Sequence, residues 1–150
     1  MAQTDSTTFV DPADRYFQSW LHWEYKAYVG KTGYNYGFWN SNGTVNQEMV
    51  QTLTRTYATA IAGHGLAMAF NVTTGDFLLK FLLDTSISAP TEVYAYQQLH
   101  YPKGAAIKVT PAVLKWEEAR PNYFAFTPTE AAEDQTIVTI AIKNYSPTQT

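Results

Sequence analysis

The stretch LAMAFNVTTGDFLLKFLL, residues 66–83, has apolar side chains at every second position on either side of a polar centre. The alternation runs through residues 66–72 and again through residues 77–83. A period of two residues is typical of a strand that buries one face. The polar centre, Thr-Thr-Gly-Asp at residues 73–76, has the composition of a hairpin turn. The stretch therefore predicts an antiparallel hairpin that covers a hydrophobic core.

Further segments downstream of the hairpin have strand composition, and prolines or polar loops separate them. They are residues 91–98, 106–110, 113–116, 123–126 and 136–143. Short strands at this spacing predict an antiparallel β-sandwich. The acidic segment 128–135 is expected to be an exposed loop.

A helix is predicted upstream of the hairpin, over residues 44–63. Thr44 and Gln47 have the spacing of a capping box, in which two side chains satisfy reciprocal backbone donors. Apolar residues recur at every fourth position along the segment and form one stripe. The helix is expected to end at Gly63, with Gly65 close behind.

The stretch SWLHWEYK, residues 19–26, has the composition of one barrel-type strand, centred on residues 20–25. Before it, Asp11 and Pro12 predict the start of a short helix that continues to about residue 18. After it comes a loop, residues 30–40, in which glycines alternate with aromatic residues. A helix, a strand, a loop and a helix in that order are typical closing units of an α/β architecture.

A single strand of this kind cannot close a sheet or bury both of its faces. We therefore expect residues 1–64 to be the last strand and helix of a (β/α) barrel of the TIM type. Residues 65–150 are expected to form the β-sandwich domain. The predicted fold class is mainly β, or α+β for the chain as a whole.

The composition narrows the classes of partner. Hydrophobic residues make up 45% of the chain and charged residues 15%, which excludes a solvated disordered chain. The net charge of -3 leaves no basic face for nucleic acid, so no such partner is expected. Cysteine is absent, which excludes a disulfide framework and a thiolate metal site.

The amino-terminal residues show no basic region followed by an apolar run, so no signal peptide is predicted within this chain. Three sequons for N-glycosylation begin at Asn42, Asn71 and Asn144. They favour a secreted or lysosomal location for the protein from which the chain derives.

No motif for nucleophilic hydrolysis or for a metal site is present in the sequence. There is no Gly-x-Ser-x-Gly elbow, and no pair of histidines has the spacing of zinc ligands. His64, placed just after the predicted helix, is interpreted as a cation at a helix terminus, and His100 as a structural residue. No catalytic residue, metal or cofactor is therefore predicted in this chain.

Glycoside hydrolysis requires two carboxylates on either side of the scissile bond. Glu117 and Glu118 are adjacent in a strand, so they are expected to point to opposite sides into solvent. Glu24 lies at the end of the barrel-type strand, where active-site residues of barrels gather, but a single carboxylate is not a pair. An ion pair of Glu24 with Lys26 or Arg55 is an equal alternative.

Aromatic residues cluster at the end of the barrel-type strand and in the loop after it. They are Trp23, Tyr25, Tyr34, Tyr36, Phe38 and Trp39. A flat ring can cover the apolar face of a sugar or contact a lipid chain. Trp23, Tyr25 and Trp39 are the predicted substrate-binding residues; the alternative is that the rings only seal the seam between strand and helix.

Several segments together resemble the endoglycoceramidase branch of glycoside hydrolase family 5. QSWLHWEYK at residues 18–26 is similar to the last barrel strand of those enzymes, and RTYATAIAG at residues 55–63 to their final-helix signature. That signature usually carries proline where this chain has Ala58. TGDF, APTEVY and HYPKG, which begin at residues 74, 89 and 100, resemble their appended β-sandwich.

The resemblance implies a retaining glycosidase that cleaves glycosphingolipids, of the endoglycoceramidase or glucosylceramidase type. It implies that both catalytic glutamates lie upstream of these residues, so that the chain is not catalytic by itself. It also implies that Trp23 lines the sugar-binding cleft, with Tyr25 and Lys26 at the rim. The glycolipid substrate would then bind mainly through the barrel.

Two further hypotheses stay open. In one, the sandwich is a stand-alone, non-catalytic module that binds glycan or contacts a membrane surface, through exposed Tyr94, Tyr96 and Tyr101. In the other, it only supports the barrel, through an apolar docking surface around Leu53, Tyr57 and the first hairpin.

Overall fold

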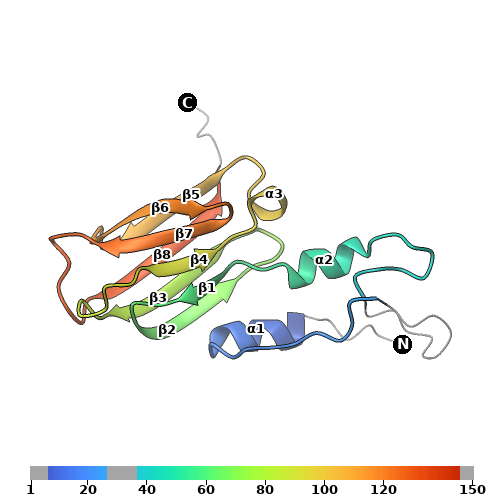
Figure 1. Cartoon of the computed structure of the whole chain (residues 1–150), viewed down its shortest axis with the longest axis horizontal. Coiled ribbons are helices and arrows are strands. Elements are labelled where there is room, and N and C mark those ends of the chain that lie inside the picture. Colours follow the sequence, from blue (N-terminus) through green and yellow to red (C-terminus); the bar gives the residue numbers. More distant parts are fainter. Residues whose placement is uncertain (1–6, 27–36, 146–150) are drawn as a thin grey trace.

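The computed structural model describes residues 7–26 and 37–145 of the chain, shown in Figure 1. The helices are α1 (Thr7–Arg15), α2 (Gln47–Leu53) and α3 (Gln97–His100). The strands are β1 (Tyr57–Ala60), β2 (Gly63–Phe70), β3 (Phe77–Leu83), β4 (Thr91–Tyr94), β5 (Ala105–Thr110), β6 (Leu114–Arg120), β7 (Tyr123–Pro128) and β8 (Ile137–Asn144).

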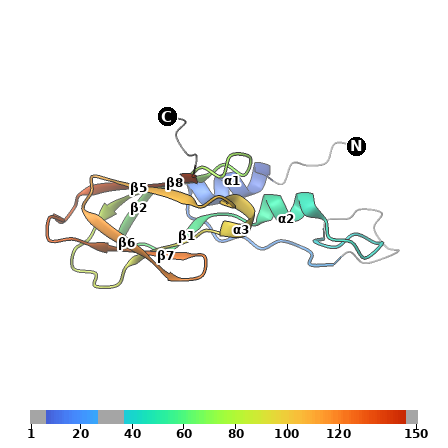
Figure 2. The same cartoon turned by 90° about the horizontal axis from the view of Figure 1, so that it is seen from above.

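The strands form two four-stranded antiparallel sheets, in the orders β1-β4-β7-β6 and β2-β3-β8-β5. Figure 2 shows the two sheets as separate layers, with α2 beyond one end of them. The central hairpin pairs Phe70 with Phe77, as the alternating sequence predicts. The mainly β fold with an antiparallel sandwich is confirmed.

The core lies between the two sheets and follows the period of two. In β3, Phe77, Leu79, Phe81 and Leu83 are buried while Leu78 and Lys80 face out. The neighbouring β8 buries alternate residues in the same way, with Ile140 fully inaccessible to solvent. The second sheet contributes side chains that include Val93, Phe124 and Phe126.

The predicted helix over residues 44–63 is wrong in its second half, because α2 ends at Leu53. Strand β1 takes the residues that follow, and its backbone pairs with β4 at Tyr57–Tyr94 and Ala58–Val93. The apolar residues at every fourth position are compatible with a helix. Pairing with β4, which is distant in sequence, gives the backbone amides and carbonyls of β1 the hydrogen bonds that a helix would otherwise supply.

The predicted ends of that helix are also wrong. Its N-cap is Asn46, whose side-chain oxygen accepts from the Met49 amide at 3.2 Å, whereas the Thr44 hydroxyl donates to Asn42 in the preceding turn. Gly63 starts β2 instead of ending the helix. Its φ is 147°, and a Cβ there would lie 2.0 Å from the Leu82 carbonyl oxygen, so only glycine fits. His64 therefore lies in a strand, where no helix terminus is available to it.

Residues 20–25 do not form the predicted strand. Just after this segment, Lys26 forms an isolated parallel bridge with Trp39. The Tyr25 carbonyl oxygen accepts a hydrogen bond from the Phe38 amide at 3.0 Å, but residues 20–25 do not form a strand ladder. The segment predicted as a strand over 91–98 is divided, since β4 ends at Tyr94 and α3 follows.

Helix α1 begins before Asp11, so the predicted N-cap at that residue is also wrong. Asp11 and Asp14 both accept hydrogen bonds from the guanidinium group of Arg55, each at 2.6 Å. Arg55 also donates to the Phe70 carbonyl oxygen in β2 at 3.1 Å. Arg55 therefore forms its ion pairs with α1. The predicted alternative, an ion pair between Glu24 and Arg55, is wrong.

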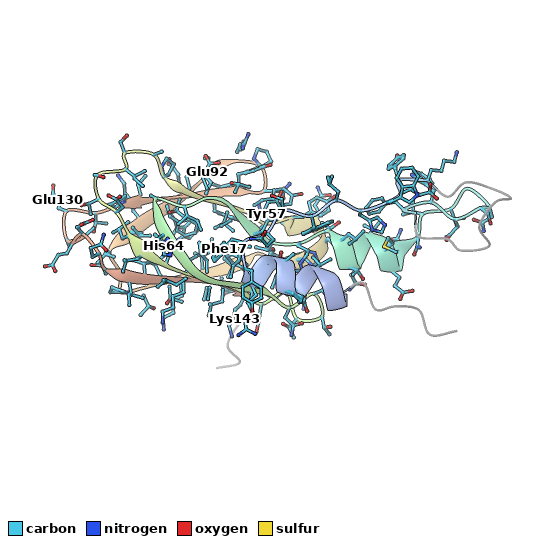
Figure 3. All side chains as sticks on the ribbon, turned by 90° about the horizontal axis from the view of Figure 1, so that it is seen from below. Phe17, Tyr57, His64, Glu92, Glu130 and Lys143 are labelled. Atoms are coloured by element: carbon cyan, nitrogen blue, oxygen red, sulfur yellow. The ribbon has the colours of Figure 1, made fainter. Side chains whose placement is uncertain are left out.

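The chain reverses direction after α1 at Phe17, where φ is 54°. Figure 3 shows Phe17 at the end of α1 beside the strands. Its ring occupies the space above Gly65, where a Cβ would lie 2.7 Å from a ring carbon. Arg55 and this ring together dock α1 on β2. The sequence predicts a boundary between two domains at residues 64 and 65. The first paired strand of the sandwich, β1, lies before that boundary, and the boundary itself stays a prediction.

The core predicts a clear contrast between two isoleucines of β8. Ile140→Ala is expected to lower the free energy of unfolding by about 2–5 kcal/mol, because it opens a cavity between the sheets. Ile137→Ala removes the same atoms from a side chain that is 50% exposed and serves as the matched control. Urea unfolding of both variants measures the difference; equal losses would contradict the assignment of the core face.

The buried ion pair predicts a second contrast. Arg55→Ala leaves the buried carboxylate of Asp14 without its partner and is expected to cost about 3–5 kcal/mol. Arg15→Ala, on the exposed side of α1, is expected to change stability by less than about 1 kcal/mol. Hydrogen exchange of α1 should accelerate only in the first variant, and unchanged exchange there would show that other contacts hold the helix.

Candidate substrate-contact site

The described segments that carry the predicted aromatic cluster, residues 20–26 and 37–46, lie near the amino end of α2 (Figure 1). Two segments meet there, one before and one after residues 27–36. The Phe38 amide donates to the Tyr25 carbonyl oxygen at 3.0 Å, and Trp39 forms bridges with both Lys26 and Val45. Two stretches that are distant in sequence are thereby held side by side.

A tight turn positions Trp39. The Asn42 side-chain oxygen accepts from the amide and the hydroxyl of Thr44, at 3.0 and 2.7 Å. The Asn40 amide donates to the Thr44 carbonyl oxygen at 2.8 Å, and Gly43 between them has a φ of 80°. Asparagine and glycine favour such turns, so the local sequence itself directs the chain back from Trp39 to Val45.

The structure holds Tyr25 and Trp39 on adjacent stretches of the chain. The side chains of the three predicted contact residues are exposed to different degrees. Trp23 is 81% exposed and Tyr25 is 70% exposed, whereas Trp39 is partly buried. The Tyr25 ring packs against Phe38, with 6.3 Å between ring centroids. Tyr34 and Tyr36 lie outside the described residues. A substrate role for Trp23, Tyr25 and Trp39 stays a prediction.

The glutamates considered from the sequence lie on different parts of the molecule: Glu24 is on the segment of the aromatic cluster, whereas Glu117 and Glu118 are on β6. Glu24 lies partly buried between Trp23 and Tyr25. Glu117 and Glu118 are exposed on β6, as the sequence predicts. The carboxylate of Glu118 accepts hydrogen bonds from Gln97 and from a backbone amide, so its role there is structural. Within residues 7–26 and 37–145, no group of three or more histidine or acidic side chains could hold a metal ion.

The three sequon asparagines lie on the surface. The side-chain oxygens of Asn42 and Asn71 accept hydrogen bonds from backbone amides within turns. The side-chain nitrogen of Asn144 donates a hydrogen bond to the Thr74 carbonyl oxygen at 2.9 Å. This nitrogen is the atom that would carry a glycan. Glycosylation at these positions stays a prediction. None of the described helices is long and apolar enough to pass through a membrane.

A row of aromatic side chains crosses the outer face of the β1-β4-β7-β6 sheet. Tyr57 pairs with Tyr94, and Tyr94 pairs with Tyr123, on three neighbouring strands. The ring centroids are 5.5 and 5.1 Å apart. Arg120, opposite Tyr123 on β6, places its guanidinium carbon 3.7 Å from that ring's centroid. We call Tyr57, Tyr94, Tyr123 and Arg120 the tyrosine row.

A groove of about 840 Å³ adjoins the tyrosine row. The segment after α1 and the start of β1 form its walls, and residues from both the row and the ion pair line it. The lining includes Phe17, Gln18, Ser19, Trp20, Arg55 and Tyr57. Leu53 and Tyr57, around which the sequence predicts an apolar docking surface, both line the groove. The tyrosine row itself is not predicted, because the sequence places Tyr57 in a helix. The predicted exposure of Tyr101 is wrong, since it is 1% exposed and packs in the core.

Burial changes the acidity of several hydroxyl groups at this end of the sandwich. It raises the pKa of Tyr57 and of Tyr94, and neighbouring tyrosines add to the rise. It raises the pKa of Tyr101 to about 12, although the hydrogen bond between Tyr101 and the Thr56 hydroxyl acts in the opposite direction. These phenols remain protonated at neutral pH.

Two other buried ionisable groups lie between α1, α2 and the sandwich. Burial raises the pKa of Asp14, and the ion pair with Arg55 opposes the rise. His100 is 5% exposed, and its Nε2 donates to the Thr54 carbonyl oxygen just after α2. Burial lowers the pKa of His100 and keeps the ring neutral. The structural role predicted for His100 is confirmed by this position.

Comparison with known proteins adds independent information on the family. The model of the glycoside hydrolase family 5 C-terminal domain matches residues 55–142. An endoglycoceramidase of Hydra vulgaris is 30% identical over 134 residues, which cover 88% of this chain and 26% of that protein. An endoglycoceramidase of Cyanea nozakii is 32% identical over 114 residues, 72% of this chain and 22% of that protein. The chain thus spans about a quarter of the length of these relatives.

Solved structures support the fold at lower sequence identity. Endoglycoceramidase II from Rhodococcus, in complex with ganglioside GM3, superposes with a TM-score of 0.55 at 20% identity. That superposition covers 73% of this chain and 22% of the enzyme. Sterylglucosidase 1 of Cryptococcus neoformans superposes with a TM-score of 0.52 at 16% identity, over 65% of this chain and 14% of that one.

The neutral buried His100 predicts loss of stability in mild acid. Unfolding exposes the ring, which then takes up a proton near pH 6.5, whereas the folded state resists protonation. The unfolded state therefore binds more protons, and the free energy of unfolding falls as the pH drops from about 6.5 to 5, by up to about 1.4 kcal/mol per pH unit. His100→Gln should flatten this dependence and the exposed His64→Gln should not; urea unfolding at each pH measures both. An equally steep dependence in His100→Gln would contradict the prediction.

Proposed function

Since the chain belongs to the family of glycoside hydrolase family 5 C-terminal domains, we propose that it is the C-terminal portion of a glycosidase that acts on glycosphingolipids. The proposed activity is of the endoglycoceramidase type. One observation carries the proposal furthest. The similarity to the Hydra endoglycoceramidase covers 88% of the chain, so it extends beyond the sandwich matched by the family model into the upstream segment.

The chemistry in this proposal belongs to a barrel upstream of the described residues. A retaining glycosidase needs two carboxylates about 5 Å apart, one as nucleophile and one as acid and base. Three acidic residues of the described segments have structural roles. Asp11 and Asp14 hold Arg55, and Glu118 caps a turn on the sheet. The chain by itself is therefore proposed to be non-catalytic.

Trp23, Tyr25 and Trp39 contribute to substrate binding in this proposal. Trp23 and Tyr25 lie towards the carboxyl end of the segment proposed as the last barrel strand, and Trp39 bridges to Lys26 just after it. That end is where barrel active sites form. The exposed indole of Trp23 offers a flat apolar surface to a sugar ring, while the sugar hydroxyls stay free for hydrogen bonds. The sequons at Asn42, Asn71 and Asn144 support a secreted or lysosomal location for the complete enzyme.

A fusion protein tests the proposal directly. The upstream part of the Hydra endoglycoceramidase is joined to this chain in place of the matching region, and hydrolysis of a fluorescent ganglioside is measured. Turnover is expected from the fusion and not from the 150-residue chain alone. Turnover by the chain alone would show that catalysis needs no upstream residues.

The second candidate function is a binding module, and the partly exposed tyrosine row favours it. Co-sedimentation of the 150-residue chain with vesicles that contain ganglioside GM3 tests this candidate. Binding at micromolar protein, absent with phosphatidylcholine vesicles, would favour the module over a purely supporting sandwich.

Trp23→Ala in the fusion is expected to lower kcat/KM by roughly tenfold. The loss of an aromatic contact on the order of 1–2 kcal/mol corresponds to a change of that size. The matched control is Trp116→Ala, which removes a 46% exposed indole from β6, away from the cluster. Equal activity of the two variants on the fluorescent ganglioside would remove Trp23 from the contact site.

A further inference from the structure

The two sheets of the sandwich differ in charge. The strands of the sheet β2-β3-β8-β5 contain three lysines and no acidic residue. The strands of the sheet β1-β4-β7-β6 contain three glutamates, one lysine and one arginine. The net charge of -3 does not show this difference, and no segment of the sequence groups the lysines, because each comes from a different strand.

All three lysines of the first sheet point away from the core. Lys80 and Lys143 are exposed residues of strands in which exposed and buried positions alternate. Lys108 is exposed on β5, and its neighbours in the strand pack against the core. Figure 3 shows Lys143 and Glu92 on opposite sides of the sandwich. We call the outer face of this sheet, with Lys80, Lys108 and Lys143, the lysine face.

Small side chains lie beside the lysines. Each lysine is paired with a small residue of the neighbouring strand: Lys80 with Thr139, Lys108 with Ala141 and Lys143 with Ala106. Such short side chains cannot cover the charged groups. Lys108 and Lys143 are diagonal neighbours on adjacent strands, which places them about 7–8 Å apart. Like charges at this distance repel each other, and an anionic partner would relieve the repulsion.

Carboxylates compensate one of the three charges. Lys143 forms an ion pair with Asp76 in the β2–β3 turn at 3.5 Å. Within residues 7–26 and 37–145, no ion pair includes Lys80 or Lys108. Asp84, in the segment after β3, accepts hydrogen bonds from Ser86 in its own turn. The lysine face therefore keeps two uncompensated positive charges.

Aliphatic side chains are exposed on the same sheet. Leu66, Leu78 and Ile137 are 44%, 41% and 50% exposed. Leu78 and Lys108 lie on either side of Ala141 in one row across three strands. Aliphatic groups and lysines together suit the interface of an anionic bilayer, where lysine stems pack on apolar surface and carry the charge to the headgroups. A soluble polyanion would gain nothing from the aliphatic side chains.

The acidic sheet does not prevent such a contact. The two layers of a sandwich are about 10 Å apart, so Glu92 and Glu117 on the far side lie beyond that distance from a surface that touches the lysine face. Charges at more than about 8 Å are largely screened at physiological ionic strength. An anionic surface would therefore interact mainly with the lysines, although the whole chain has a negative net charge.

We propose that the lysine face binds the surface of a membrane that contains anionic phospholipids. The lysines pair with the anionic headgroups, and Leu78 and Ile137 enter the boundary between headgroups and acyl chains. This contact requires neither the barrel nor glycosidase activity. In an enzyme with the proposed function, it would hold the protein on the surface that contains its glycolipid substrate.

Co-sedimentation of the 150-residue chain with vesicles tests the proposal. The chain is expected to bind vesicles of phosphatidylserine and phosphatidylcholine in equal parts, and not vesicles of phosphatidylcholine alone. The double variant Lys80→Gln, Lys108→Gln should lower the partition coefficient at least about tenfold, since each lysine near an anionic surface contributes roughly fivefold. The matched control Lys115→Gln, Arg120→Gln removes two charges from the opposite sheet and should bind like the unmodified chain.

The outcomes separate this proposal from others. Absence of binding by the unmodified chain, or equal losses in the two double variants, would overturn the lysine face. Retention on heparin without vesicle binding would overturn the lipid in favour of a soluble polyanion. An active fusion with the Hydra barrel, combined with a chain that does not bind the vesicles, overturns the lysine face and leaves the proposed function in place. An inactive fusion with a chain that binds them supports the lysine face and counts against the glycosidase.

The absence of cysteine allows a single label to locate the contact. Thr139→Cys carries a fluorophore on the lysine face, and Thr127→Cys carries it on the outer face of the opposite sheet; both threonines are partly buried. A label at position 139 is expected to shift its emission to shorter wavelength when phosphatidylserine vesicles are added, because it enters a less polar environment. No shift at position 139, or a larger shift at position 127, would overturn the assignment of the face.

Discussion

The arrangement of this molecule depends on the ion pair between Arg55 and α1. The guanidinium group joins three parts of the chain: the two carboxylates of α1, the Phe70 carbonyl oxygen of β2, and its own position between α2 and β1. Because Asp14 and Arg55 are both buried, neither can move away without leaving a charge unpaired in the interior. The pair therefore fixes α1 on the sandwich, and with it the point at which the chain leaves towards the aromatic cluster.

The sandwich itself could be predicted from sequence because its signal is local. A strand that buries one face repeats every two residues, and β3 and β8 show this repeat without interruption. The end of α2 could not be predicted in the same way. Tyr57 and Ile61 continue the apolar spacing of the predicted helix, but residues 57–60 form a strand because β4 pairs with them from a distant position in sequence.

In the candidate site, too, the residues predicted from the sequence are those with a local signal. Trp23, Tyr25 and Trp39 were found from a local accumulation of aromatic residues and from family resemblance, and the structure holds Tyr25 and Trp39 on adjacent stretches. The tyrosine row depends on the register of three strands that lie far apart in sequence. No pattern within a single segment contains that register. The ion pair of Arg55 is likewise a contact between residues more than 40 positions apart.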